Sequence, residues 1–257
     1  MMIYHIINSI LLLTGMEDRN EIQEMIWKGY SMNKWLKALL FLLGAAFLTR
    51  LIPFSNWFRI LDTMIHELGH AVMTLVMSGS VLRIELNPDH SGVTYSMLSA
   101  GWSQVAVSLA GYISASLFAI ALFYGYYKQK QTIGLVIISV IAVTMIVFFV
   151  RSGYGLWWII IFVIVNLLFY FIGGRIQNFY YLLLSFLCLE ESVMGPVTLL
   201  LRSLTQPNHA GDATNLANTT MIPAFIWALL FVAISFWCAK TALQLYWKDR
   251  TPVSPPK

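Results

Sequence analysis

Two histidines four residues apart, His66 and His70, lie in an apolar stretch over residues 60–77 that contains no proline and is predicted to be helical. On a helix, positions four apart share one face, so both imidazoles can offer a nitrogen to the same zinc ion. Glu67 then lies beside the water that the metal binds, and zinc lowers the pKa of such a water from about 15.7 to about 7. A neighbouring glutamate can take the proton and later hand it to a leaving amine. This spacing therefore predicts hydrolysis, most often of a peptide bond.

The apolar setting of this motif argues against a chance pattern on a solvated helix face. The side chains around it are Leu61, Met64, Ile65, Leu68, Ala71, Val72, Leu75 and Val76. A charged side chain at bilayer depth costs about 2.5–3.5 kcal/mol on insertion scales, so charged residues are kept there only where something compensates. We therefore expect His66, Glu67 and His70 to belong to a metal site.

The composition is that of an integral membrane protein. Of the 257 residues, 58% are hydrophobic and only 11% are charged, against roughly 25% charged residues in an average soluble domain. The net charge of +4 comes from lysines and arginines scattered at the ends of apolar segments. This distribution suits lipid head groups and lacks the dense basic block that nucleic acid requires, so we expect the lipid bilayer as a partner and no nucleic acid. Cys188 and Cys238 both lie in apolar runs and are predicted to pack within the membrane.

The predicted fold class is an all-α membrane protein, a polytopic bundle of about six to seven transmembrane helices with a small β-hairpin after the catalytic helix. Apolar runs predict helices over residues 35–54, 57–77, 103–127, 132–150, 156–172, 177–201 and 222–246. β-Branched residues that partly alternate predict strands over 81–86 and 92–96, and the turn residues 87–91 join them. In the sixth predicted helix, Gly195-Pro196 predicts a break or kink.

A single transmembrane domain that carries the metal site is predicted over residues 32–247. Residues 1–31 are an uninformative N-terminal extension, and residues 248–257 form a short basic tail. Lys34 and Lys37 precede the first apolar run, which predicts a cytoplasmic N-terminus. With seven full crossings, the hairpin and the polar stretch before the last helix would also be cytoplasmic, and the tail would lie outside.

A third zinc ligand must come from elsewhere in the chain, because catalytic zinc sites use three protein ligands and keep a fourth position for water. The candidates are His209 and Asp212 in the polar stretch before the last helix, followed by Glu190 and Glu191. Residues 212–217 could form one or two helical turns directed back at the site. Glu190 and Glu191 can equally mark a polar end where their helix reaches the membrane interface.

Several motifs of this chain occur together in one known family. They are His66-Glu67-Leu68-Gly69-His70-Ala71, Gly79, Val81-Leu82-Arg83-Ile84-Glu85-Leu86, Ser91-Gly92-Val93-Thr94-Tyr95, Ala110-Gly111-Tyr112 and Asp212-Ala213. With these motifs, about residues 60–235 resemble a small bacterial branch of the site-2 protease family of intramembrane zinc metallopeptidases. The resemblance implies that His66, His70 and Asp212 hold Zn²⁺ and that Glu67 is the general base. The sequence departs from the family pattern around the third ligand. The family usually has leucine-aspartate-glycine there, and this chain has Gly211-Asp212-Ala213.

The function implied by the resemblance is that of an intramembrane zinc metalloprotease, a multi-pass protein of the bacterial cell membrane that cuts a membrane-bound or membrane-adjacent protein. Asp212 matches the family's third ligand, and His209 is its rival. A zinc carrier and a non-catalytic zinc-binding membrane protein are the alternatives. A carrier needs ionisable or polar groups along a path through several helices, and the predicted helices 132–150 and 156–172 contain no ionisable residue. The hairpin either pairs with an unwound substrate through an exposed strand edge or plugs the mouth of the bundle.

Overall fold

The computed structural model describes residues 34–99, 101–151 and 153–248. The prediction for residues 1–31 falls outside the described residues, as does most of the predicted tail. Contacts divide the chain into two units, Met1–Leu40 and Phe41–Lys257. The first unit contributes only the first turns of one helix to the described part.

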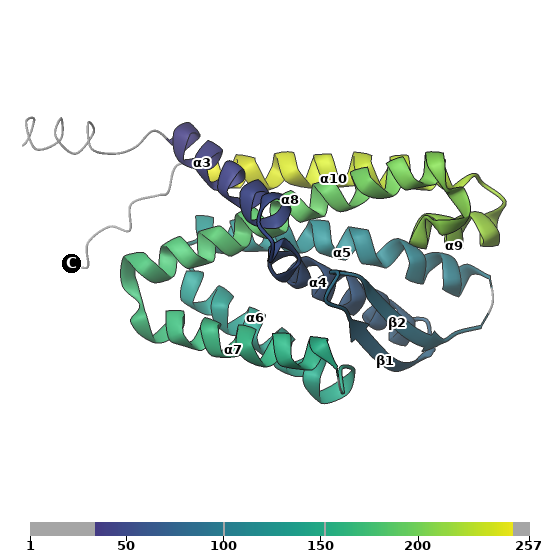
Figure 1. Ribbon diagram of the computed structural model, residues 1–257, viewed down its shortest axis with the longest axis horizontal. Helices are drawn as coiled ribbons and strands as arrows, with labels where there is room; N and C mark the ends of the chain where they lie inside the picture. The colour runs from purple at the N-terminus through teal and green to yellow at the C-terminus, as the bar shows by residue number, and fades with distance from the viewer. Residues whose placement is uncertain (1–33, 100, 152, 249–257) are drawn as a thin grey trace, which may run out of the picture. The chain divides into compact units, whose positions relative to one another are not determined.

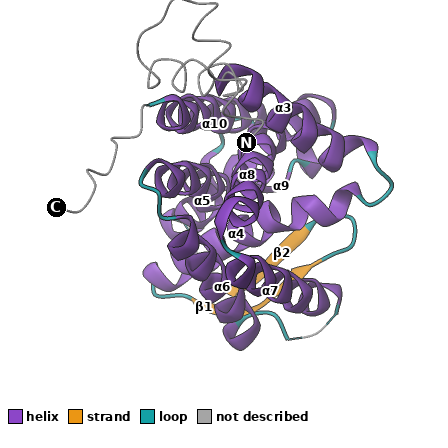
Figure 2. Cartoon of the chain, turned by 90° about the vertical axis from the view of Figure 1, so that its left-hand side faces the viewer, coloured by secondary structure: helices purple, strands orange, loops and turns teal. Residues whose placement is uncertain are grey.

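Helices make up most of the described chain, and one two-stranded sheet accompanies them (Figures 1 and 2). The elements are α3 (Lys34–Ala46), the π-helical turn η1 (Phe47–Leu51), α4 (Ser55–Val76), β1 (Ser80–Leu86), β2 (Gly92–Met97), α5 (Trp102–Tyr127), α6 (Gln131–Phe148), α7 (Tyr154–Ile172), α8 (Gly174–Thr205), the 3₁₀ turn η2 (Pro207–His209), α9 (Gly211–Thr220) and α10 (Ala224–Trp247). The predicted all-α polytopic fold with a hairpin after the motif helix is confirmed.

The number of membrane crossings depends on one bent pair of helices. Within the described residues, α5, α6, α7, α8 and α10 are each long and apolar enough to cross a membrane. The helix Lys34–Leu51 and α4 pass the same test as a pair and are bent by 104° at their junction, which gives up to six candidate spans. Pro53 lies in this junction, and because proline disfavours helical geometry in the residue before it, the first helix ends there.

Helix α5 is the central element of the second unit and contacts α4, α8 and α10 (Figure 2). Its contact with α4 is close because small residues line it. A Cβ added to Gly69 would overlap the hydroxyl of Ser114 and lie 2.9 Å from the carbonyl oxygen of Ala110. Between helices in lipid, such tight packing replaces the hydrophobic force that would hold them together in water.

The hairpin is fastened to α4 and to the end of α6. Its strands pair antiparallel, with Ile84 opposite Thr94. The backbone N–H of buried Ile84 donates to the carbonyl of Phe149 at 3.0 Å. At the hairpin tip, the hydroxyl of Thr63 on α4 donates to the carbonyl of His90 at 2.9 Å. These contacts hold β2 alongside the helix that carries the histidines.

Helix α8 runs unbroken from Gly174 to Thr205. Of the break or kink predicted at Gly195-Pro196, the break does not occur. A proline removes one donor from the helical ladder, but in a membrane bundle the packing of neighbouring helices maintains the helix around it. Pro196 is buried in such packing.

Glu190 and Glu191 lie midway along α8, inside the bundle, and not at a polar helix end. The guanidinium of Arg50 donates to Glu190 at 3.2 Å and to Glu191 at 2.6 Å. Arg59 on α4 donates to Glu191 at 2.9 Å, and the Thr49 hydroxyl donates to Glu190 at 2.9 Å. Glu191 is 4% exposed. These five residues, the arginine–glutamate cluster, join η1 and α4 to α8.

Removing one partner of this cluster leaves a buried charge without compensation, which typically costs about 3–5 kcal/mol. We expect Glu191→Ala to lower the thermal unfolding temperature of the detergent-purified protein strongly. Glu85→Ala is the control, because it removes the carboxylate of an exposed pair, Arg83–Glu85, and exposed pairs add little stability. Equal shifts for the two variants would contradict a structural role for the cluster.

Candidate metal centre

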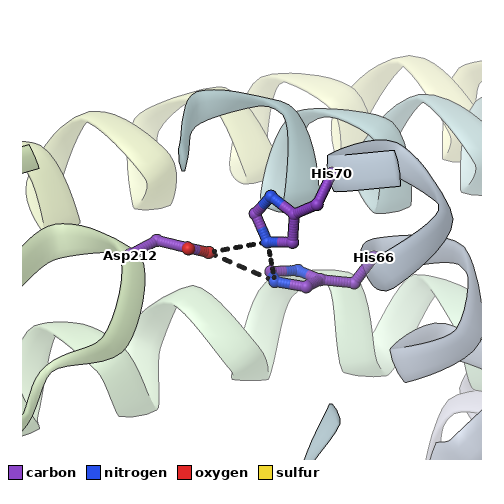
Figure 3. Close-up of side chains that lie close together, drawn as sticks. All are labelled: His66, His70 and Asp212. Atoms are coloured by element: carbon purple, nitrogen blue, oxygen red, sulfur yellow. Dashed lines mark hydrogen bonds and ion pairs between the residues drawn. The ribbon is translucent and has the colours of Figure 1, made fainter. Parts of the chain in front are cut away.

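His66, His70 and Asp212 come together from two distant segments of the chain (Figure 3). The Nε2 atoms of the two histidines are 3.0 Å apart. Oδ2 of Asp212 lies 3.2 Å from Nε2 of His66 and 3.3 Å from Nε2 of His70. One ligand atom from each residue lies within 4.8 Å of the others. Lone pairs that converge in this way suit a shared cation, and two histidines with one carboxylate are a donor set of catalytic zinc sites.

Asp212 is positioned by α9, the short helix that the sequence predicted as one or two turns. It lies in the first turn of α9, and the buried side chains of Ala213 and Leu216 pack in a cluster with residues of α5, α8 and α10. His209 ends the preceding 3₁₀ turn, and its side chain is exposed. It lines the cavity into which His66, His70 and Asp212 also face. Among the described residues, the converging group contains Asp212 and not His209.

A backbone carbonyl orients the second histidine. Nδ1 of His70 lies 2.7 Å from the carbonyl oxygen of Val107 on α5. Since a carbonyl only accepts, Nδ1 carries the proton and donates, which leaves the lone pair of Nε2 free to bind a metal. The ring of His66 packs edge-on against Tyr112, with ring centroids 4.5 Å apart. Helix α5 therefore fixes both imidazoles.

Gly111 on α5 makes room for the histidines. A Cβ added to this residue would lie 2.6 Å from Nε2 of His66 and 2.6 Å from Nε2 of His70. No real side chain tolerates such contacts without moving its neighbours. The metal-binding atoms can converge here only because the facing helix has no side chain at this point.

Glu67 is held by the hairpin. Glu67 is 4% exposed, and the hydroxyl of Thr94 on β2 lies 2.6 Å from its Oε2 and 3.1 Å from its backbone carbonyl oxygen. Gly92, the first residue of β2, lies so close that a Cβ would be 2.6 Å from Oε1. In the sequence, Gly92 and Thr94 belong to a motif shared with the family, but the motif indicates no role for either residue. They lie far from Glu67 in the chain, and only the folded hairpin brings them next to it.

The site opens into a cavity of about 830 Å³. Residues of α4, β2, α5, α8 and α9 line it, and charged groups gather near the hairpin tip, among them Arg59 and Glu191. Burial, followed by the charge of Arg59, lowers the pKa of His90 at this tip to about 4, so its imidazole is neutral at neutral pH. Burial alone would raise the pKa of Asp212, but in the metal-free site the protonated imidazoles of His70 and His66 hold this pKa well below its usual value. Asp212 is therefore a carboxylate, the form that binds a cation.

Gly111→Ala tests the close approach of α5 to the histidines. The added methyl group overlaps both imidazoles, so we expect the purified variant to lose most of its bound metal in elemental analysis. Gly44→Ala is the control, because a Cβ at this helical glycine meets nothing within 4 Å. Full metal content in Gly111→Ala would contradict the geometry described for His66 and His70.

Thr94→Val tests whether the hydroxyl of this residue positions Glu67. Valine keeps the shape of the side chain and removes the donor, so we expect peptide hydrolysis at least about tenfold slower, which corresponds to about 1.4 kcal/mol, with metal content unchanged. Thr94→Ser retains the hydroxyl and should restore most of the rate. If Thr94→Ser is as slow as Thr94→Val, the methyl group and not the hydrogen bond is what matters.

Comparison with known proteins gives one match. Residues 38–242 match the family described as Peptidase M50B-like. No curated protein matches the chain, and no solved structure does. The match covers most of the chain, including α4, the hairpin and α9. It supports the resemblance to the site-2 protease family drawn from the motifs, and the chain belongs to the Peptidase M50B-like family.

Proposed function

We propose that this protein is an intramembrane zinc metalloprotease that hydrolyses peptide bonds of a membrane-bound or membrane-adjacent protein. The observation that carries the proposal is the convergence of His66, His70 and Asp212 beside Glu67 in one cavity. In the proposal the first three residues hold zinc and Glu67 is the general base. Membership in a peptidase family supports the same reaction.

The proposed role of each residue follows from the contacts of its side chain. When bound, zinc would polarise a carbonyl and supply a water whose pKa is about 7. Glu67 accepts a proton from the attacking water and delivers it to the leaving amine. Thr94 donates to Oε2 of Glu67 and holds the carboxylate in place for this transfer. Val107 keeps His70 in the tautomer that leaves Nε2 unprotonated.

A substrate must reach the site as an extended chain, because a helix hides its carbonyl groups in its own hydrogen bonds. The cavity is of a size that accommodates a short extended segment. Its walls include Gly92, Val93 and Thr94 at the start of β2, which brings a strand close to the reacting groups. This placement favours a role of the hairpin in holding substrate over a role as a plug.

A zinc carrier is less well supported. Its path would need polar groups across several helices. Helices α6 and α7 contain no Asp, Glu, Lys, Arg or His, and the converging group lies within a single cavity. A non-catalytic zinc protein differs from the proposed enzyme only in activity and is separated from it by the next experiment.

A panel of single variants distinguishes the proposed zinc ligands from the proposed general base. We expect about one zinc per chain in the purified protein, and loss of zinc in His66→Ala, His70→Ala and Asp212→Ala, because each removes one of three ligands. His209→Ala should retain the metal. Glu67→Gln should retain zinc and abolish cleavage of an unfolded protein substrate, because the base is not a ligand.

Elemental analysis and a cleavage assay on the same preparations read out this panel. Zinc retained in Asp212→Ala but lost in His209→Ala would reassign the third ligand. Cleavage that survives Glu67→Gln would contradict the proposed protease mechanism. Wild-type protein that binds zinc and cuts no substrate would contradict the proposed protease function.

A further inference from the structure

Asp62 on α4 lines the same cavity as His66 and His70 and lies on the same face of the helix. It precedes His66 by about one helical turn, which places the two residues about 6 Å apart along the helix axis. Asp62 is partly buried. Among the described residues, no group forms a hydrogen bond or an ion pair with its carboxylate. The cavity wall therefore carries an unpartnered carboxylate beside the candidate metal centre.

The neighbouring arginines do not compensate this charge. The charged groups that act on Asp62 are those of the arginine–glutamate cluster. Arg59, about one turn before Asp62, donates to Glu191 at 2.9 Å. Arg50 donates to both glutamates of the cluster. Two arginines therefore face three carboxylates when Asp62 is counted with the cluster, and one negative charge is left over at the cavity wall.

The other carboxylates of the cavity lining all have partners. These partners are Thr94 for Glu67, Ser91 for Asp89, Arg59 for Glu191 and the two histidines for Asp212. Arg202 also lines the cavity, but it extends from the last turn of α8, about 16 Å farther along the helix than Glu191. Asp62 is therefore the position in the lining where a cationic group from outside the fold would be stabilised.

A metal ion does not suit this position. Divalent cations need several converging ligands, and among the described residues the group that converges is His66, His70 and Asp212. A lysine or arginine side chain needs only one carboxylate, and its alkyl stem packs on apolar surface while its charged head reaches the acid. Val93 and Leu199 supply apolar surface in the same cavity. These features favour a basic side chain that enters with the substrate.

We propose that Asp62 is a specificity residue, which binds a lysine or arginine side chain of the substrate close to the bond that is cleaved. An extended chain advances about 3.3 Å per residue, so the offset of about 6 Å between Asp62 and His66 corresponds to about two residues of substrate. This proposal rests on the proposed protease function and names part of its substrate class. A basic side chain bound here also balances the charge of the arginine–glutamate cluster.

Peptide binding tests this proposal without hydrolysis. The full-length protein carrying Glu67→Gln is titrated into two fluorescein-labelled peptides of alanine and serine, which differ only in a central lysine or norleucine. Norleucine keeps the alkyl stem and lacks the charge. We expect fluorescence anisotropy to show that the lysine peptide binds at least about tenfold more tightly, because a charged group gains an ion pair in a partly buried site.

The substitution Asp62→Asn in the same background removes the charge and keeps the size of the side chain. It should reduce the difference between the two peptides to less than about twofold. Asp89→Asn is the matched control, because it neutralises a carboxylate of the same lining that already accepts from Ser91, and it should keep the lysine preference. Asp62→Asn should not lower the thermal unfolding temperature, since it removes a charge that has no partner within the described fold.

Equal binding of the two peptides to the Glu67→Gln protein, including no binding of either, would contradict the proposal. A lysine preference that survives Asp62→Asn would do the same. A fall in unfolding temperature as large as that of Glu191→Ala would give Asp62 a structural role in place of the proposed one. The titration requires no cleavage, so failure of the protease function appears separately, as wild-type protein that binds zinc and cuts no unfolded substrate.

Discussion

An ionisable side chain inside an apolar bundle must find a partner, and this constraint shapes the whole structure. The protein meets it twice along one face of α4. Arg59 is compensated by Glu191, and two turns later the lone pairs of His66 and His70 converge with those of Asp212. In the first arrangement, each arginine is paired directly with a glutamate of α8. The second brings together lone pairs that suit a shared cation, and this difference separates a structural cluster from a candidate metal site.

The candidate metal centre also depends on the absence of side chains at two surrounding positions. Two glycines face it, Gly111 from α5 and Gly92 from β2, and each stands where a methyl group would strike a functional side chain. Opposite these gaps, single polar contacts hold the groups in place, from Val107 to His70 and from Thr94 to Glu67. Such preorganisation would allow Glu67, the proposed general base, to act without first rearranging. The hairpin therefore belongs to the site as much as the helix that carries the motif.

Local patterns in the sequence predicted the helices, the hairpin and the histidine motif well, because each depends on residues close together in the chain. Asp212 was singled out only through a family resemblance, since nothing nearby in the sequence links it to residues more than a hundred positions earlier. Glu190 and Glu191 were ambiguous for the same reason: their partners Arg50 and Arg59 lie far upstream. The break predicted at Pro196 failed because helix packing in a membrane outweighs a single missing donor.

The distance in sequence between the two halves of the centre has a consequence for biosynthesis. His66, Glu67 and His70, together with Thr94 and the supporting carbonyl of Val107, belong to the early part of the chain and can assemble once α5 has been inserted. Asp212 is translated only after three further helices, α6, α7 and α8. In the proposed enzyme, a nascent chain therefore carries the general base and two of the three zinc ligands long before the third is translated. The proposed zinc site, and with it the proposed hydrolysis, is therefore completed only when insertion into the bilayer is nearly finished.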